Sequence, residues 1–223
     1  MNILITANES LSYATEELIY FLNKYTNVNV GKDIKEPNKT INLFVDNILH
    51  KSNYNISGNS VCLKISGGSL SAVLCGVYDA LAEGGIFFEA TGYSVPRAFD
   101  LEVFFNVNKK VNPKFRLRGI RQHINFPMDV SSYTLKEAKE YIRSLARMRY
   151  NAITFHSYPG QWHEVNTEGE KDTIDKHTGR IHGNIGVTTS QQMLQSELDI
   201  ARFNIIQEIT NLFMTELCIC VYE

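Results

Sequence analysis

The sequence predicts an α/β protein built in two parts. Over the first hundred or so residues, short apolar segments alternate with two amphipathic helical segments, an order typical of a small α/β sandwich. Residues 106–113 are polar and contain a proline, which indicates a junction. Beyond it, one amphipathic helix lies between two apolar segments, as in a parallel βαβ unit. We therefore expect an α/β domain over residues 1–108 and a second domain over 114–223.

The composition is that of a globular protein and excludes several classes of partner. The chain has 223 residues, of which 43% are hydrophobic and 21% charged. Its formal charge of -2, without a long basic block, predicts no binding to nucleic acid. No apolar stretch is long enough for a membrane span. Residues 1–6 lack the pattern of a signal peptide, so the compartment stays open: cytoplasmic, or periplasmic or secreted if a leader has been omitted.

The first domain begins with a strand, a helix and a second strand. Residues 2–6 and 41–45 are rich in Ile, Leu and Val, as strands are. Between them, apolar residues recur at helical spacing up to Tyr25, which predicts a helix with one buried stripe. Ser12 is the expected N-cap, and Glu17 falls in an early turn, where the helix dipole favours acids.

A hairpin and a second helix follow. Residues 54–56 and 61–65 are separated by Ser-Gly-Asn-Ser, a hairpin signal. Ser69 is the expected cap of the second helix, which Gly84 and Gly85 end. Gly76 lies inside this helix, and we expect it to permit close approach to the sheet. Two further apolar segments are 86–88, expected as a strand, and 101–105, which alternates as a strand would.

The second domain shows a different pattern. Residues 115–120 and 151–155 predict strands, and Thr134 with Glu137 predicts a capping box for the helix between them. A long polar loop is expected over 164–186. A last helix over 198–212 and an apolar run over 217–222, which could be a strand, complete the pattern.

The potential metal ligands do not form a recognisable site. Cys62, Cys75, Cys218 and Cys220 lack the spacing of a disulfide framework, and the C-x-C pair fits small apolar residues in a strand. His156, His163, His177 and His182 match no short zinc pattern. The acidic run over 164–175 is interpreted as a solvated face rather than a catalytic pair. We expect neither a metal nor a cofactor.

Two stretches resemble a known pairing of domains. Residues 60–96 contain V-C-L-K-I, A-V-L-C-G-V-Y-D-A-L and G-I-F-F. They resemble the accessory domain that precedes the barrel in β-hexosaminidase-type and α-glucuronidase-type glycoside hydrolases. Residues 118–120 followed by 145–156, L-A-R-M-R-Y-N-A-I-T-F-H, resemble the opening of the catalytic barrel in the same enzymes. The resemblance implies a small α/β sandwich followed by an incomplete (β/α) barrel.

The sequence departs from the hexosaminidase pattern at the strand ends. After the first barrel strand, residues 121–126 have neither the Asp nor the substrate-binding Arg of that family in place. His156 is kept, but the Asp that usually follows it is missing, while Trp162 stands where the family often has a Trp. No residue matches a family catalytic acid, so we assign none. These departures favour a relative that acts on another sugar.

The resemblance also implies where substrate would bind. Barrel enzymes bind substrate at the carboxyl ends of their strands. The candidate substrate-binding residues are therefore His123, Asn125, His156, Tyr158, Gln161 and Trp162. Each also has a simpler interpretation, as a satisfied polar group at a strand end or, for Trp162, as a core residue.

Two functions remain open at this point. The first is the N-terminal portion of a glycoside hydrolase that acts on carbohydrate and is inactive alone. The alternative is a non-catalytic carbohydrate-binding or scaffold module. An unfinished barrel would leave an exposed strand edge, so self-association through that edge is also expected.

Overall fold

The computed structural model describes residues 1–123, 135–156 and 220–222, which fall into two compact units. Unit 1 comprises Met1–Arg118 together with Arg143–Asn151. Unit 2 comprises Gly119–Ile142 and the chain from Ala152 onward. The predicted α/β class is confirmed in both units.

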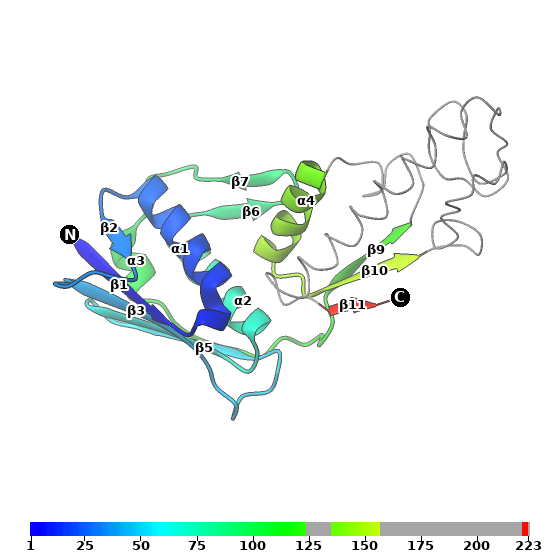
Figure 1. Cartoon of the computed structure of the whole chain (residues 1–223), viewed down its shortest axis with the longest axis horizontal. Helices are drawn as coiled ribbons and strands as arrows, with labels where there is room; N and C mark the ends of the chain where they lie inside the picture. Colours follow the sequence, from blue (N-terminus) through cyan, green and yellow to red (C-terminus); the bar gives the residue numbers. More distant parts are fainter. Residues whose placement is uncertain (124–134, 157–219, 223) are drawn as a thin grey trace, which may run out of the picture. The chain divides into compact units, whose positions relative to one another are not determined.

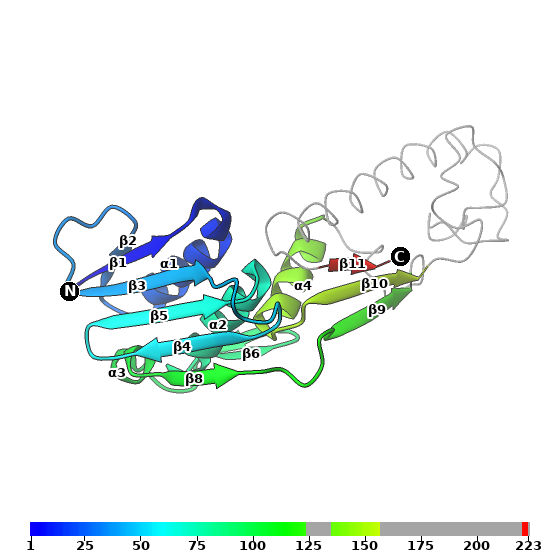
Figure 2. The ribbon, with the colours of Figure 1, turned by 90° about the horizontal axis from the view of Figure 1, so that it is seen from below.

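Unit 1 is built on a six-stranded mixed sheet in the order β2-β1-β3-β5-β4-β8 (Figure 2). The strands are β1 (Asn2–Ala7), β2 (Asn29–Gly31), β3 (Lys39–Val45), β4 (Tyr54–Gly58), β5 (Cys62–Gly67) and β8 (Asn108–Val111). Strands β2, β1, β3 and β5 run parallel to one another, whereas β4 is antiparallel to both β5 and β8. The predicted hairpin is thus the β4–β5 pair.

Two helices cover one face of this sheet (Figure 1). They are α1 (Ser12–Tyr25), preceded by the short η1 (Glu9–Leu11), and α2 (Leu70–Glu83). The core between sheet and helices is formed by Ile3, Ile5, Leu18, Phe21, Ile41, Leu63, Ile65, Val77 and Leu81, all fully or almost fully buried. A Cβ on Gly76 would lie 2.7 Å from Ile65 Cγ2, which confirms the predicted close approach of α2 to the sheet. Ser69 caps α2 by accepting from the Ala72 N–H, also as predicted.

A short hairpin lies on the other side of the helices. It consists of β6 (Phe87–Glu89) and β7 (Gly92–Ser94) (Figure 1). Its Phe88 and Tyr93 rings pack edge-to-face on Phe21, with centroids 5.5 and 5.0 Å away. This aromatic cluster gives unit 1 a third layer above α1.

Two local predictions in unit 1 were wrong. Ser12 is the first residue of α1 and not its N-cap: Leu11 occupies the N-cap position without a side-chain cap, and Asn8 caps the preceding turn η1 by accepting from the Ser10 N–H. Residues 101–105 form the helix α3 (Leu101–Phe105), not an extended segment. The Asp100 carboxylate accepts two N–H groups at its start, and both Phe104 and Phe105 are buried. The Asp100 cap favours a helix here, although the alternation of apolar and polar residues indicated a strand.

The polar segment predicted as a domain junction is part of the sheet. Residues 108–111 form β8, an edge strand paired antiparallel with β4. Lysines on an edge strand discourage pairing with other chains. They also make β8 resemble a linker in composition, which explains the difference from the prediction.

The predicted βαβ unit is present, with both strands in unit 2 and residues 143–147 of its helix in unit 1. Strand β9 (Gly119–His123) pairs in parallel with β10 (Ala152–His156), and α4 (Leu135–Arg147) connects them in sequence. β9 begins later than the predicted strand over 115–120. A third strand, β11 (Cys220–Tyr222), pairs in parallel with β10 and confirms the strand expected in the last apolar run. The predicted loop over 164–186 and helix over 198–212 lie outside the described residues.

Among the helices of residues 1–123 and 135–156, none combines the length and apolar character required to cross a membrane.

Candidate functional site at the β9 and β10 strand ends

The carboxyl ends of β9 and β10 place two histidines at one edge of the sheet. His123 ends β9 and His156 ends β10, and the parallel register makes them direct partners. Neighbouring strands lie about 4.8 Å apart, so the two backbones meet at this edge. The other predicted substrate-binding residues, Asn125, Tyr158, Gln161 and Trp162, lie outside the described residues. Of the six predicted substrate-binding residues, the structure thus places the backbones of His123 and His156 next to each other.

An asparagine clamp fixes where both strands begin. The Asn151 side chain accepts from the Arg118 N–H at 2.8 Å and donates to the Arg116 carbonyl at 2.9 Å. The backbone N–H of Asn151 donates to the Arg118 carbonyl. Because Arg118 precedes β9 and Asn151 precedes β10, these bonds set the starting points from which the register follows. Sequence analysis placed Asn151 in a strand and missed this role.

A buried ion pair holds the end of α4 within unit 1. The Arg147 Nε and one terminal nitrogen donate to the two Glu17 carboxylate oxygens, each at 2.9 Å. The Tyr78 hydroxyl donates to the same carboxylate at 2.9 Å. Burial opposes the charge of Arg147, but its hydrogen bonds to Glu17 outweigh this and hold its pKa above the usual value. Burial, followed by the Glu17 charge, raises the pKa of Tyr78.

Glu17 was expected to interact with the helix dipole, whereas it faces the core. One signal in the sequence indicated this. Glu17 lies three residues after Ala14 and one before Leu18, so it sits beside the apolar stripe of α1. An acid at that position is buried, and a buried acid requires a partner.

A second charged cluster joins α2 to the turn after α4. Arg149 donates to Asp79 at 3.0 Å, and the Tyr54 hydroxyl donates to the same carboxylate at 3.3 Å. Arg149 has a positive φ of 67°, a backbone conformation that is costly without glycine. Burial and then the Asp79 charge raise the pKa of Tyr54. Arg149 therefore holds a strained turn in place through an ion pair.

These residues line a hollow of about 450 Å³, formed by Tyr54, Val111, Pro113, Arg118, Met148, Arg149 and Tyr150. Both guanidinium groups that line it bond within unit 1, although the Nε of Arg149 is buried without a partner among the described residues. Arg118 donates to the carbonyls of Phe115 and Arg149, and Arg149 pairs with Asp79. The cluster therefore stabilises unit 1 rather than presenting free charge to a ligand.

Among the residues that the structure describes, neither unit supplies a metal site or a free pair of buried acids. No three His, Cys, Asp or Glu side chains converge among the residues that the structure describes. The described carboxylates with low exposure, Glu17 and Asp79, are each held in ion pairs. The histidines considered as ligands beyond His156, and the acidic run over 164–175, lie outside the described residues.

Comparison with known proteins identifies the fold of the chain. No family model matches the sequence. No curated protein matches it either. Solved structures match over nearly the whole chain. One is a GH20 exo-β-N-acetylglucosaminidase from Vibrio harveyi, at 14% identity and a TM-score of 0.56 over 99% of this chain. Another is a GH138 enzyme targeting pectin rhamnogalacturonan II, at 14% identity and a TM-score of 0.59 over 97%.

The chain shares its fold with part of these glycoside hydrolases. A GH20 β-N-acetylhexosaminidase from Streptomyces coelicolor A3(2) matches likewise, at 14% identity and a TM-score of 0.54 over 91% of this chain. The chain spans 32%, 30% and 40% of the lengths of the three enzymes. The predicted resemblance to a glycoside hydrolase region is confirmed at the level of fold. An α/β sandwich followed by an incomplete barrel agrees with that partial coverage.

Proposed function

We propose that this chain is the N-terminal portion of a glycoside hydrolase acting on carbohydrate O-glycosyl bonds, and that it is inactive by itself. The observation that carries this is the parallel β9–β10 pair, which ends in two partnered histidines. Carboxyl ends of parallel strands are where β/α folds bind substrate. The fold shared with GH20 and GH138 enzymes supports the same assignment.

In this proposal the chain contributes substrate contacts and not the reacting acids. His123 and His156 donate or accept hydrogen bonds to sugar hydroxyls. Asn125, Tyr158, Gln161 and Trp162 follow the same strands in sequence and add amide donors and aromatic surface. Glycoside hydrolysis usually requires a pair of carboxyl groups about 5–10 Å apart. Glu17 and Asp79 are unsuited to this role because arginines hold both in ion pairs.

The test is a hydrolysis assay of the purified 223-residue chain with a panel of nitrophenyl glycosides. We expect no release of nitrophenol above the buffer rate. Turnover abolished by replacing an acid in the 164–175 run would show that the acidic run is catalytic and would overturn the proposed inactivity.

Binding separates this proposal from the non-catalytic alternative. A strand-end substrate site predicts that His123→Ala and His156→Ala each weaken the binding of a neutral oligosaccharide, measured by calorimetry. The alternative, a carbohydrate-binding or scaffold module, agrees equally well with the engagement of both Glu17 and Asp79 in ion pairs. Under that alternative, binding persists in both variants, because the contacts lie elsewhere on the chain.

A further inference from the structure

The sheet face opposite the helices carries a hollow that the strand-end site does not include. It measures about 420 Å³ and is lined by Phe44, Asn55, Ile56, Ser57, Lys64, Ser66, Asn108, Lys109 and Lys110. All of these residues belong to unit 1. Register places Phe44, Ser66, Asn55 and Lys110 in one row across four strands. Lys64, Ser57 and Asn108 form the adjacent row.

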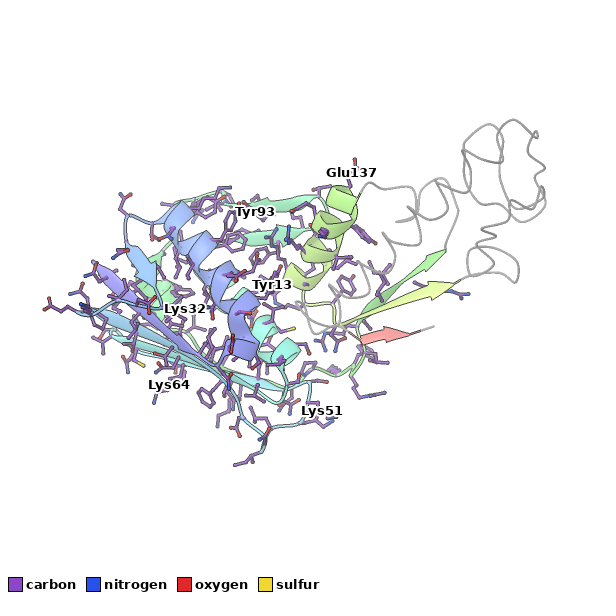
Figure 3. The ribbon with its side chains drawn as sticks, viewed as in Figure 1. Tyr13, Lys32, Lys51, Lys64, Tyr93 and Glu137 are labelled. Carbon is purple, nitrogen blue, oxygen red and sulfur yellow. The ribbon has the colours of Figure 1, made fainter. Side chains whose placement is uncertain are left out.

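The charge of this hollow is positive and partly unneutralised. Lys64 and Lys110 are exposed, and neither has an acidic partner among the described residues. Figure 3 shows Lys64 projecting from the sheet on the side away from the helices. Lys109 is different, because its ammonium pairs with Asp79 and Glu83 on α2. No acidic residue lines the hollow.

The remaining lining offers groups that suit sugars. Phe44 is 43% exposed, although it lies within a strand. The side chains of Asn55, Ser57 and Ser66 make no hydrogen bond within the described part of the chain, so they are free to bond hydroxyls. Asn108 is less available, since it already bonds the Gly58 backbone. The surface combines one apolar ring, free polar groups and two cations.

Other occupants fit this surface less well. Lysine is depleted from the cores of protein–protein interfaces, whereas Lys64 lies within this hollow. Single-stranded nucleic acid binds to successive aromatic platforms in a strongly basic groove. Here the lining has one aromatic residue, and the chain has a formal charge of -2.

We propose that this sheet face binds a glycan carrying carboxylate groups, such as a chain of uronic acids. Lys64 lies on β5 and Lys110 lies two strands away on β8, in a row shifted by two residues along the strands. In ideal sheet geometry, their Cα atoms are about 12 Å apart. A ligand that meets both ammonium groups is therefore longer than one sugar. Charge-assisted hydrogen bonds from the lysines select carboxylates. With two widely spaced cations, the surface matches a glycan of moderate charge density better than a densely sulfated polymer.

The experiment measures binding of a short oligogalacturonate to the full 223-residue chain by calorimetry. We expect binding that weakens as salt rises, and much weaker binding of monomeric galacturonate and of a maltooligosaccharide of equal length. The double variant K64A/K110A should lower the affinity about tenfold or more, because it removes two charge-assisted contacts. F44A should lower it by a smaller factor.

The matched control is K32A/K51A, which removes the same charge from two exposed loop lysines (Figure 3). Its affinity should equal that of the unaltered chain, and circular dichroism checks that all variants fold. If both double variants lost the same affinity, the effect would come from the net charge of the chain, and the proposal would be overturned. The proposal would also be overturned if dextran sulfate or single-stranded DNA bound more tightly than oligogalacturonate. The same holds if oligogalacturonate did not bind at all. None of these outcomes depends on the hydrolysis assay.

Discussion

At the scale of single residues, the most consequential side chain in unit 1 is Glu17. It is 7% exposed and accepts three hydrogen bonds, two from Arg147 and one from Tyr78. The Arg147 guanidinium also lies 5.2 Å from the Phe21 ring centroid. A buried charge is tolerated only when its partners replace water. Glu17 therefore secures the last turn of α4 to α1 and α2.

We expect Glu17→Gln to lower the free energy of unfolding by about 3–5 kcal/mol, because it leaves the buried Arg147 charge unpaired. Chemical denaturation of the full chain measures the change. Glu16→Gln is the matched control, since Glu16 lies on the same helix and is exposed. It should shift the free energy by no more than about 0.5 kcal/mol. Equal effects of the two substitutions would mean that the ion pair contributes no net stability.

At the scale of elements, the sequence predicted correctly the helices in which the apolar periodicity and the capping residues indicate the same structure. The α2 segment shows this: Ser69, the apolar stripe and Gly84 each indicate the same helix, and the structure contains it. Residues 101–105 were misassigned because five residues fit both periods, and only the Asp100 cap separates them. β8 was missed because an edge strand needs few apolar residues. The strand-end histidines were found because a βαβ order predicts parallel strands, whose carboxyl ends lie at the same end of the sheet.

The Asn151 clamp and the Arg149 turn could not be found in this way. Each depends on a contact between residues that are far apart in sequence, such as Arg118 with Asn151 or Asp79 with Arg149. Composition and periodicity report only the local environment of a residue. The pairing of polar groups across elements is decided by tertiary packing.

The predicted domain boundary leads to a test on shortened chains. Residues 1–108 contain the core between the sheet and α1 and α2, so this segment should unfold cooperatively on heating, but below the full chain, because it lacks Arg147, the ion-pair partner of buried Glu17. A segment over 1–118 adds β8, which covers the β4 edge and brings Lys109 to Asp79 and Glu83. We expect the longer segment to melt at a higher temperature, measured by circular dichroism. A non-cooperative melt of both segments would contradict an independently folding first domain.

At the scale of the whole molecule, the strand edges and exposed apolar residues determine how the chain behaves in solution. Among the described strands, β9 and β11 are the edges of the three-stranded sheet, as β2 and β8 are of the six-stranded sheet. Edge strands of this kind template association through their free N–H and C=O groups. The segment leading into β9 adds apolar surface, with Phe115 73% exposed and Leu117 42% exposed.

We therefore expect the 223-residue chain to self-associate, with an apparent mass that rises with concentration in size-exclusion chromatography with light scattering. Phe115→Lys should shift the equilibrium toward monomer, because it replaces exposed apolar surface in the segment that precedes β9 with a charge. Ile48→Lys is the matched control, since Ile48 is 94% exposed but lies in the loop after β3. It should leave the association unchanged. Hydrogen exchange of the associated chain should show added protection along residues 119–123. A monomer at all concentrations, with strong protection of β9, would mean that the chain covers this edge itself and would contradict association through it.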